Sequence, residues 1–196
     1  MRKPPATMCV AFNGPPGIGK DTLADMILES ACGAVYRGTL ATMIREMAAL
    51  HYNMPEFQRL SSDRETKDKH YPGFPKGVST PRQALIFFSE KIIKPRYGAD
   101  YFAERFAAEM KDHRFSMMTD LGFDVEAQCL ADEIEFLVIV QLHHPDFDFS
   151  NDSRNYVDIE RDNVVVIKHT TDRGNAARDA ALINSKICEA FEAKCR

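Results

Sequence analysis

The stretch FNGPPGIGKDT, residues 12–22, contains the residue types that hold a phosphate chain. Gly14, Gly19 and Lys20 have the spacing of a phosphate-binding loop, G-x4-GK. Glycines let successive backbone N–H groups turn toward one anion, and a helix that begins at the lysine adds partial positive charge. The lysine would reach the β and γ phosphates and balance charge that shifts in the transition state. The alternative is a plain glycine-rich turn between a strand and a helix. The predicted ligand-binding residues are Gly14, Gly17, Ile18, Gly19, Lys20, Asp21 and Thr22.

Asp21 stands where a loop of this kind usually has a serine or threonine whose hydroxyl contacts Mg²⁺. Either the Asp21 carboxylate contacts the metal, directly or through water, or Thr22 takes over that contact. An acidic residue at a helix N-terminus is also favourable through the helix dipole alone. Asp120 is a second candidate for Mg²⁺ or its water shell, because it lies at the end of an expected strand. The alternative for Asp120 is a cap for the helix that begins near Gly122.

A strand before the loop and a helix after it must position these residues. Residues 8–13 form a short apolar run typical of a buried parallel strand, and apolar residues from Leu23 to Ala31 recur at helical spacing. Because strands alternate with helices, the sequence predicts a three-layer α/β/α fold with a parallel, roughly five-stranded sheet. The further strands are expected at 34–38, 115–120, 136–142 and 164–168, and the further helices at 39–51, 56–69, 81–95, 99–112 and 175–193.

The overall composition excludes several classes of protein. Hydrophobic content of 44% and charged content of 28% are ordinary for a soluble globular enzyme, and 196 residues suit one domain. A net charge of −4 argues against a general nucleic-acid binder. No apolar run reaches the length of a membrane-spanning helix, and the first residues do not resemble a signal peptide. The five cysteines form no CxxC pair, which favours a reduced, cytoplasmic chain.

A phosphate-binding loop alone is compatible with kinases, GTPases, ATP-driven motors and passive nucleotide binders. No NKxD stretch occurs, which argues against a usual GTPase, and the chain is short for a motor. A small kinase must also hold a second anion in line with the γ-phosphate, and the arginine fork binds phosphate oxygens bidentately. Arg82, Arg96 and Arg105 lie in or between the two helices that follow the proline-rich stretch 70–81. The alternative for Arg82 is an ion pair with an acid on the next helix, and the alternative for Arg105 is an ion pair with Glu104 or Glu109.

Four segments together resemble a known family. GPPGIGKDT, TPRQALIFFSEKIIKPRYGADYF, TDLGFDVEAQCL and NDSRNYVD are similar to segments of the deoxynucleoside monophosphate kinases encoded by bacteriophages. The resemblance touches segments of the chain from about residue 8 to residue 158. The GKDT ending is itself typical of that group. The resemblance implies a fold like that of P-loop nucleoside monophosphate kinases, in one domain spanning 1–196. It also implies transfer of a phosphoryl group from ATP, with Mg²⁺, to a deoxynucleoside monophosphate in the host cytoplasm.

The resemblance further implies roles for residues outside the loop. Residues 39–112 would form a helical insertion that binds the acceptor, and residues 143–156 a lid-like segment. Arg154 would act from that mobile segment, which closes over the phosphates, and Lys20 and Arg82 would complete the catalytic group. The implied acceptor-binding residues are Arg82 and Arg96 for the phosphate, and Asp100 and Tyr101 for the sugar or base, with Arg105 as a further candidate.

One position departs from the family pattern. The group often has D-x-R-F-x-x-E at the end of the third strand, whereas this chain has Gly122 in the place of the arginine. A charge near the transferred group must then come from elsewhere or be absent, and Arg154, Arg161 and Arg173 are the possible substitutes. This gap keeps a non-catalytic nucleotide sensor as an alternative, beside a kinase of the dephospho-coenzyme A type. The sequence does not indicate base specificity or whether two chains form a homodimer.

Overall fold

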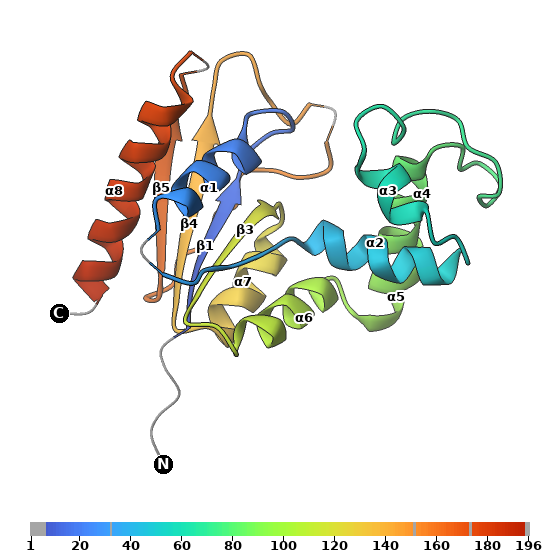
Figure 1. Cartoon of the computed structure of the whole chain (residues 1–196). Helices are drawn as coiled ribbons and strands as arrows, with labels where there is room; N and C mark the ends of the chain where they lie inside the picture. Colours follow the sequence, from blue (N-terminus) through green and yellow to red (C-terminus); the bar gives the residue numbers. More distant parts are fainter. Residues whose placement is uncertain (1–6, 32, 151, 173, 195–196) are drawn as a thin grey trace. The chain divides into compact units, whose positions relative to one another are not determined.

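The computed structural model describes residues 7–31, 33–150, 152–172 and 174–194. The chain forms two compact units, Met1–Gly38 with Ala103–Arg196, and Thr39–Phe102. The first unit contains the β-sheet and the second contains only helices and loops among its described residues (Figure 1). In the described part of the chain, no helix combines the length and the apolar character needed to cross a bilayer.

The sheet has five strands in the order β2-β3-β1-β4-β5, and every neighbouring pair is parallel. β1 occupies the centre, where Val10 pairs with Met117 on one side and with Val138 on the other. The predicted parallel, five-stranded α/β arrangement is therefore confirmed. The strands are β1 (Met8–Asn13), β2 (Tyr36–Gly38), β3 (Phe115–Leu121), β4 (Phe136–His143) and β5 (Val164–Thr170).

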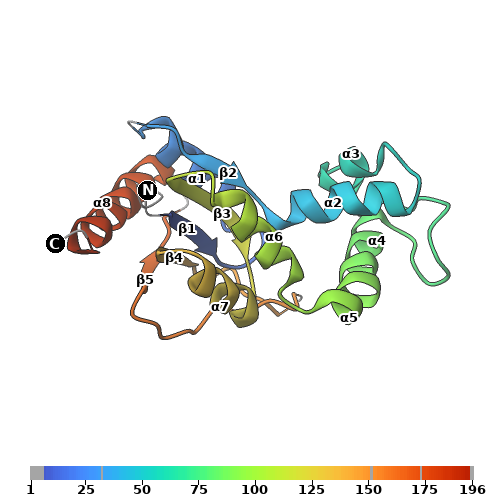
Figure 2. The same ribbon diagram turned by 90° about the horizontal axis from the view of Figure 1, so that it is seen from below.

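Helices cover both faces of this sheet. α1 (Lys20–Glu29) and α8 (Ala176–Lys194) lie on one face, and α6 (Tyr101–Met110) and α7 (Asp124–Glu133) lie on the other (Figure 2). Because side chains alternate along a strand, every second residue of β1 and β4 joins the core beneath α1 and α8. That core includes Met8, Val10, Phe12, Leu23, Ala24, Ile27, Val138, Val140, Ile183 and Ile187.

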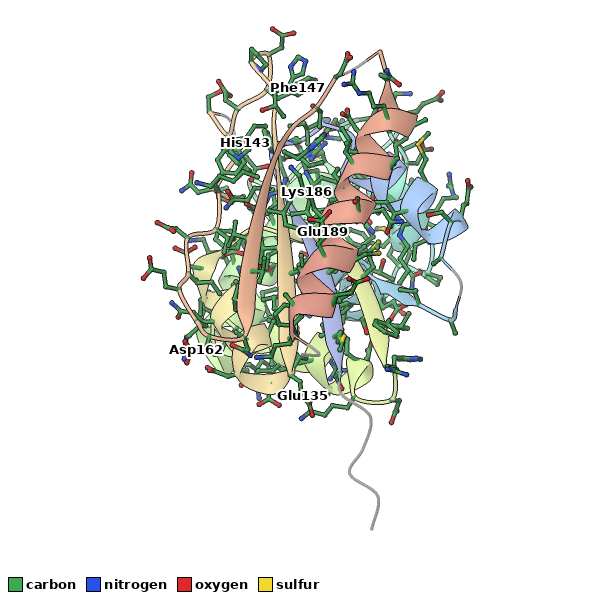
Figure 3. The ribbon with its side chains drawn as sticks, turned by 90° about the vertical axis from the view of Figure 1, so that its left-hand side faces the viewer. Glu135, His143, Phe147, Asp162, Lys186 and Glu189 are labelled. Atoms are coloured by element: carbon green, nitrogen blue, oxygen red, sulfur yellow. The ribbon has the colours of Figure 1, made fainter. Side chains whose placement is uncertain are left out.

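The strand order fixes where a ligand can bind. From β1 the chain runs to β2 and β3 on one side of it, then crosses to β4 and β5 on the other. The carboxyl ends of β1 and β3 therefore border the crevice where the chain direction switches, which is where open α/β sheets bind ligands. Figure 3 shows His143 and Phe147 toward this end of the sheet, and Glu135 and Asp162 toward the opposite end.

The Thr39–Phe102 unit is built from short helices around aromatic side chains. Thr39 and Thr80 cap α2 and α4, since their hydroxyls accept from the backbone N–H groups of Thr42 and Gln83. The cap predicted at Thr80-Pro81 is confirmed. The rings of His51, Tyr52, Phe57, Phe74 and Phe88 pack against one another. The helices are α2 (Leu40–His51), α3 (Phe57–Ser62), α4 (Pro81–Phe87), the π-helix η1 (Phe88–Ile93) and α5 (Lys94–Tyr97).

Two helix ends in this unit differ from the sequence-based expectation. The helix expected over 56–69 ends at Ser62, because the Asp63 carboxylate accepts from the backbone N–H of Glu65 and forms a local turn. The helix expected to end at Pro95 continues to Tyr97. The wider π-helical turn before Pro95 removes the clash that a proline ring makes in a regular helix.

Candidate active site

The loop between β1 and α1 depends on glycine at three positions. Gly17 and Gly19 have φ values of 80° and 100°, which residues with a side chain rarely adopt. Gly14 is packed so closely that a Cβ atom would lie 3.0 Å from the carbonyl oxygen of Leu142. Backbone conformation therefore explains why glycine occupies positions 17 and 19, and close packing explains why it occupies position 14.

The backbone of this loop supplies N–H donors to a ligand. The first bond within α1 joins the N–H of Leu23 to the carbonyl oxygen of Gly19 at 3.0 Å. The preceding N–H groups of Lys20, Asp21 and Thr22 are first-turn donors with no acceptor inside the helix. Such donors, together with the helix dipole, form an anion site. The side chain of Ile18 is buried in the core, so this predicted residue can offer only its backbone.

The Lys20 ammonium group lies within the curve of the loop. Its Nζ donates to the carbonyl oxygens of Gly14 at 2.6 Å and Pro15 at 2.9 Å. Burial, and next the nearby Arg154 cation, lower the pKa of Lys20 to about 8, although the carboxylates of Asp21 and Asp120 act in the opposite direction. A bound phosphate would favour the charged lysine, because it supplies the anion that burial makes necessary.

Asp21 links the start of α1 to two strands. Its Oδ1 accepts from the Thr119 hydroxyl on β3 at 2.6 Å and from Arg37 Nη2 on β2 at 3.2 Å. Arg37 also contacts Asp25 one turn further along α1, with an Nη1–Oδ1 distance of 2.5 Å. The carboxylate that the sequence offers as a metal ligand is therefore already engaged by a cation and a hydroxyl.

Asp120, at the carboxyl end of β3, faces two cations. Its carboxylate raises the pKa of both Lys20 and Arg154, so it lies near each of them. The Arg154 guanidinium is held by Asp152, with Nε–Oδ1 and Nη2–Oδ2 distances of 2.8 Å and 2.5 Å. This bidentate contact is the first cause of the raised pKa of Arg154 and of the lowered pKa of Asp152. The structure thus brings two cations and two carboxylates together beside the loop.

Arg154 crosses the backbone of Gly122. A Cβ atom on Gly122 would lie 2.5 Å from Cγ of Arg154 and would also overlap its Cδ. The position where the resemblance expects an arginine is therefore covered by the stem of another arginine. Arg161 instead pairs with Asp132 at 3.4 Å, near the start of β5, and Arg173 lies outside the described residues. Of the described substitutes, Arg154 is the one beside Lys20.

Asn13 anchors the segment that carries Arg154. This fully buried residue donates from Nδ2 to the carbonyl oxygens of Leu121 and Asn155, and its Oδ1 accepts from the N–H of Val157, each at 3.0 Å. Gln141 Nε2 adds a 2.6 Å bond to the Val157 carbonyl oxygen. An asparagine at the end of an otherwise apolar strand was the signal in the sequence for this anchor.

Asn13→Ala is expected to lower the free energy of unfolding by about 2–3 kcal/mol, because a buried N–H and two carbonyl oxygens lose their partner. Urea denaturation measures this loss. Asn163→Ala is the matched control, since Asn163 also bonds two carbonyl oxygens but lies near the start of β5. Both variants should be less stable, yet only Asn13→Ala should speed proteolytic cleavage between residues 144 and 157. Equal cleavage in both variants would contradict the anchoring role.

The predicted acceptor residues are distributed over both units. Arg105 is an exposed residue of α6 in the sheet-containing unit. Arg96 is exposed on α5, with its guanidinium carbon 5.3 Å from the centre of the Tyr97 ring. Tyr101 stacks on Tyr97 at 4.9 Å between ring centres, and Asp100 lies over Gly98, where the backbone turns with φ 114°. Arg96 and Tyr101 thus lie beside Tyr97, and Asp100 lies beside Gly98, the next residue.

Arg82, at the start of α4, forms a bidentate ion pair with Asp68. Nε and Nη2 lie 2.6 Å and 3.0 Å from the two carboxylate oxygens, and both side chains are about half exposed. The acid lies before α4 in the sequence, not on the following helix. An ion pair of this geometry uses the same two donors that would bind a phosphate.

Metal-ligating side chains are sparse in the described residues. No group of three or more His, Cys, Asp or Glu side chains gathers there in a way that holds a metal ion. Thr22 is exposed on the first turn of α1, and Asp120 is half-buried. A cation at this site would therefore need oxygen ligands from phosphate and water as well, which is the usual coordination of Mg²⁺ in nucleotide sites.

Comparisons with known proteins give matches only among solved structures. No family model and no curated protein matches the chain. A gluconokinase from Sinorhizobium meliloti is similar with a TM-score of 0.48 and 12% identity over 100% of both chains. A sugar kinase from Janibacter sp. gives 0.44 and 13% over 90% of this chain and 92% of that one, and a Thermus thermophilus protein gives 0.45 and 14% over 95% and 98%. These values are too low to assign a family or a substrate.

Proposed function

We propose that this protein is a kinase that transfers the γ-phosphoryl group of ATP to a deoxynucleoside monophosphate. The observation that carries the proposal is the position of Lys20, inside a glycine loop and beside Asp120 and Arg154. A loop that only holds a nucleotide has no need of a second cation next to its lysine. Transfer of a phosphoryl group does need one, because charge builds on the oxygens between donor and acceptor.

The donor is held by the loop. The first-turn N–H groups of α1 bind the β-phosphate, and Lys20 exchanges its contacts with Gly14 and Pro15 for phosphate oxygens. Arg154 stabilises the charge on the transferred group, from a segment that Asn13 anchors. Closure of residues 143–156 over the phosphates excludes water and limits hydrolysis of ATP.

Mg²⁺ fits the oxygen groups on this side of the loop. We assign it to the Thr22 hydroxyl and the Asp120 carboxylate, because Asp21 is bonded to Thr119 and Arg37. The ion would neutralise charge on the β and γ phosphates and complete its coordination with their oxygens and with water. Asp21 then acts by fixing the start of α1 against β2 and β3.

The choice of acceptor rests on the sequence resemblance together with the residues of the Thr39–Phe102 unit. Arg82 and Arg96 supply two forks for a phosphate. Asp100, beside Gly98, supplies a carboxylate for a sugar hydroxyl, and the stacked rings of Tyr97 and Tyr101 supply a surface for a base. We therefore expect the acceptor to be a nucleoside phosphate rather than a free sugar.

A panel of acceptors tests the proposal. ADP release from ATP is measured with each of the four deoxynucleoside monophosphates, with the ribonucleotides, and with dephospho-coenzyme A and gluconate. Turnover with one or more deoxynucleoside monophosphates supports the proposal. Turnover with dephospho-coenzyme A or gluconate alone would replace the acceptor, and ATP binding without turnover on any acceptor would favour a nucleotide sensor.

The lowered pKa of Lys20 predicts a pH dependence for ATP binding. Because its pKa is about 8, the charged form is present below that pH and is lost as the pH rises through it. ATP binds better to the charged form, so its dissociation constant should rise about fivefold between pH 8 and pH 9. Calorimetric titration measures this change. Lys20→Arg keeps its charge throughout, so its dissociation constant should stay flat. A flat profile in the unaltered protein would contradict the assignment.

A further inference from the structure

Four cationic side chains gather in the Thr39–Phe102 unit. The helices α2, α3 and α4 pack against one another (Figure 1). Arg45 lies on α2, Arg64 and Lys67 lie after the end of α3, and Arg82 lies at the start of α4. The backbone N–H of Arg82 donates to the Lys67 carbonyl oxygen at 2.9 Å, which joins α4 to that turn. The fold thus brings Arg45 and Arg82 toward the turn that carries Arg64 and Lys67.

The direction of the Lys67 pKa shift agrees with this arrangement of the four groups. Burial is the first cause of its lowered pKa, and the cations of Arg82, Arg64 and Arg45 lower that pKa further. Asp68 is the one carboxylate among the causes of the shift, and it acts in the opposite direction. Like charges in one place repel one another, and an anion with more than one charge would reduce that repulsion.

Asp68 occupies the fork of Arg82 with the geometry that a phosphate would use. Two parallel N–H···O contacts join the guanidinium to the carboxylate, at 2.6 Å and 3.0 Å. Both side chains are about half exposed, and exposed ion pairs of this kind contribute little to stability. A phosphate dianion carries twice the charge of Asp68 and has a third oxygen for Lys67.

We propose that Arg45, Arg64, Lys67 and Arg82 bind the phosphate of the acceptor, and that Asp68 holds the Arg82 fork until this phosphate displaces it. The inference rests on the proposed function and assigns the acceptor phosphate to a site inside one unit. It adds three cations to the predicted Arg82. It also gives Asp68 a role that a purely structural pair would not have, because Asp68 competes with the substrate.

Binding titrations of the full-length chain test the inference. A Lys20→Ala background removes the main phosphate contact of the donor loop, and each deoxynucleoside monophosphate is titrated by calorimetry. Lys67→Ala should weaken binding about tenfold, because a charge-assisted hydrogen bond is lost. Asp68→Asn should strengthen binding by about threefold to fivefold, because the amide competes less well for Arg82. Lys69→Ala is the matched control, an exposed lysine two residues away that is not a cause of the Lys67 shift.

The direction in which Asp68→Asn changes the affinity for the monophosphate distinguishes a competing role of Asp68 from a purely structural one. If Asp68 only fixes the turn to α4, then Asp68→Asn leaves binding unchanged or weakens it, which overturns the inference. Inorganic phosphate should compete with the nucleotide. A short single-stranded oligonucleotide without a terminal phosphate should not, and equal binding of that phosphodiester would also overturn the inference.

Turnover measured in the chain with Lys20 intact keeps this inference distinct from the proposed function. Monophosphate binding with the expected order of variants, but without turnover on any acceptor, would support the cation site and reject the kinase. Turnover with an unchanged KM for the acceptor in both Lys67→Ala and Asp68→Asn would support the kinase and reject the cation site. Thermal unfolding of each variant confirms that it is folded, and Asp68→Asn preserves the shape of the side chain.

Discussion

Lys20→Ala is expected to lower turnover about 10²–10³-fold, the loss typical of removing a donor that stabilises transition-state charge. The Nζ atom donates to the carbonyl oxygens of Gly14 and Pro15, and so lies within the loop that would hold the phosphates. Alanine cannot replace this cation, whereas the backbone donors of the loop remain. Turnover should therefore fall far more than ATP affinity, as measured by coupled ADP release and by calorimetry.

Lys111→Ala is the matched control for that experiment. Lys111 belongs to the same unit and forms an exposed ion pair with Glu133 at 2.7 Å, an interaction of little energetic weight. It should leave turnover and stability nearly unchanged. If Lys20→Ala kept the same turnover as Lys111→Ala, the loop would not be the site that holds the donor. That result would contradict the proposed function.

The sequence predicted the strand and the helix on either side of the loop, because their determinants are local. Glycines at fixed spacing, an apolar strand before them and an amphipathic helix after them all lie between Met8 and Glu29. Parallel strands followed from apolar runs of the right length, and the cap at Thr80 followed from a single threonine before a proline. Each of these patterns needs only neighbouring residues, so each could be read without the fold.

The contacts that complete the site could not be predicted in this way. The Thr119 hydroxyl meets Asp21 from 98 residues away, and Asn13 meets Val157 across 144 residues. No spacing rule links such positions, because the order of strands in the sheet decides which strand ends meet. From the sequence alone, Gly122 indicates a missing positive charge, because the family pattern has an arginine at this position. In the structure its missing side chain is what lets Arg154 lie there.

Arg154→Ala is the second variant with a large expected effect, a loss of about 10²–10³-fold in turnover with ATP affinity within a few fold. The guanidinium lies beside Lys20 and Asp120 and is the described cation best placed to balance charge on the transferred group. Arg161→Ala is the control, because Arg161 pairs with Asp132 near the start of β5. Equal turnover in the two variants would contradict the role of Arg154.

Gly122→Ala tests the same arginine without removing it. The new Cβ would overlap Cγ and Cδ of Arg154, so the side chain must move away from Lys20, and turnover should fall about tenfold or more. In an Arg154→Ala background only the Cβ atom of residue 154 remains, 3.2 Å from the new Cβ, and Gly122→Ala should then cost little. Such strong non-additivity is the signature of two residues that act through one contact. Additive losses would mean that Gly122 matters for another reason, and that the position of Arg154 over it has no part in the reaction.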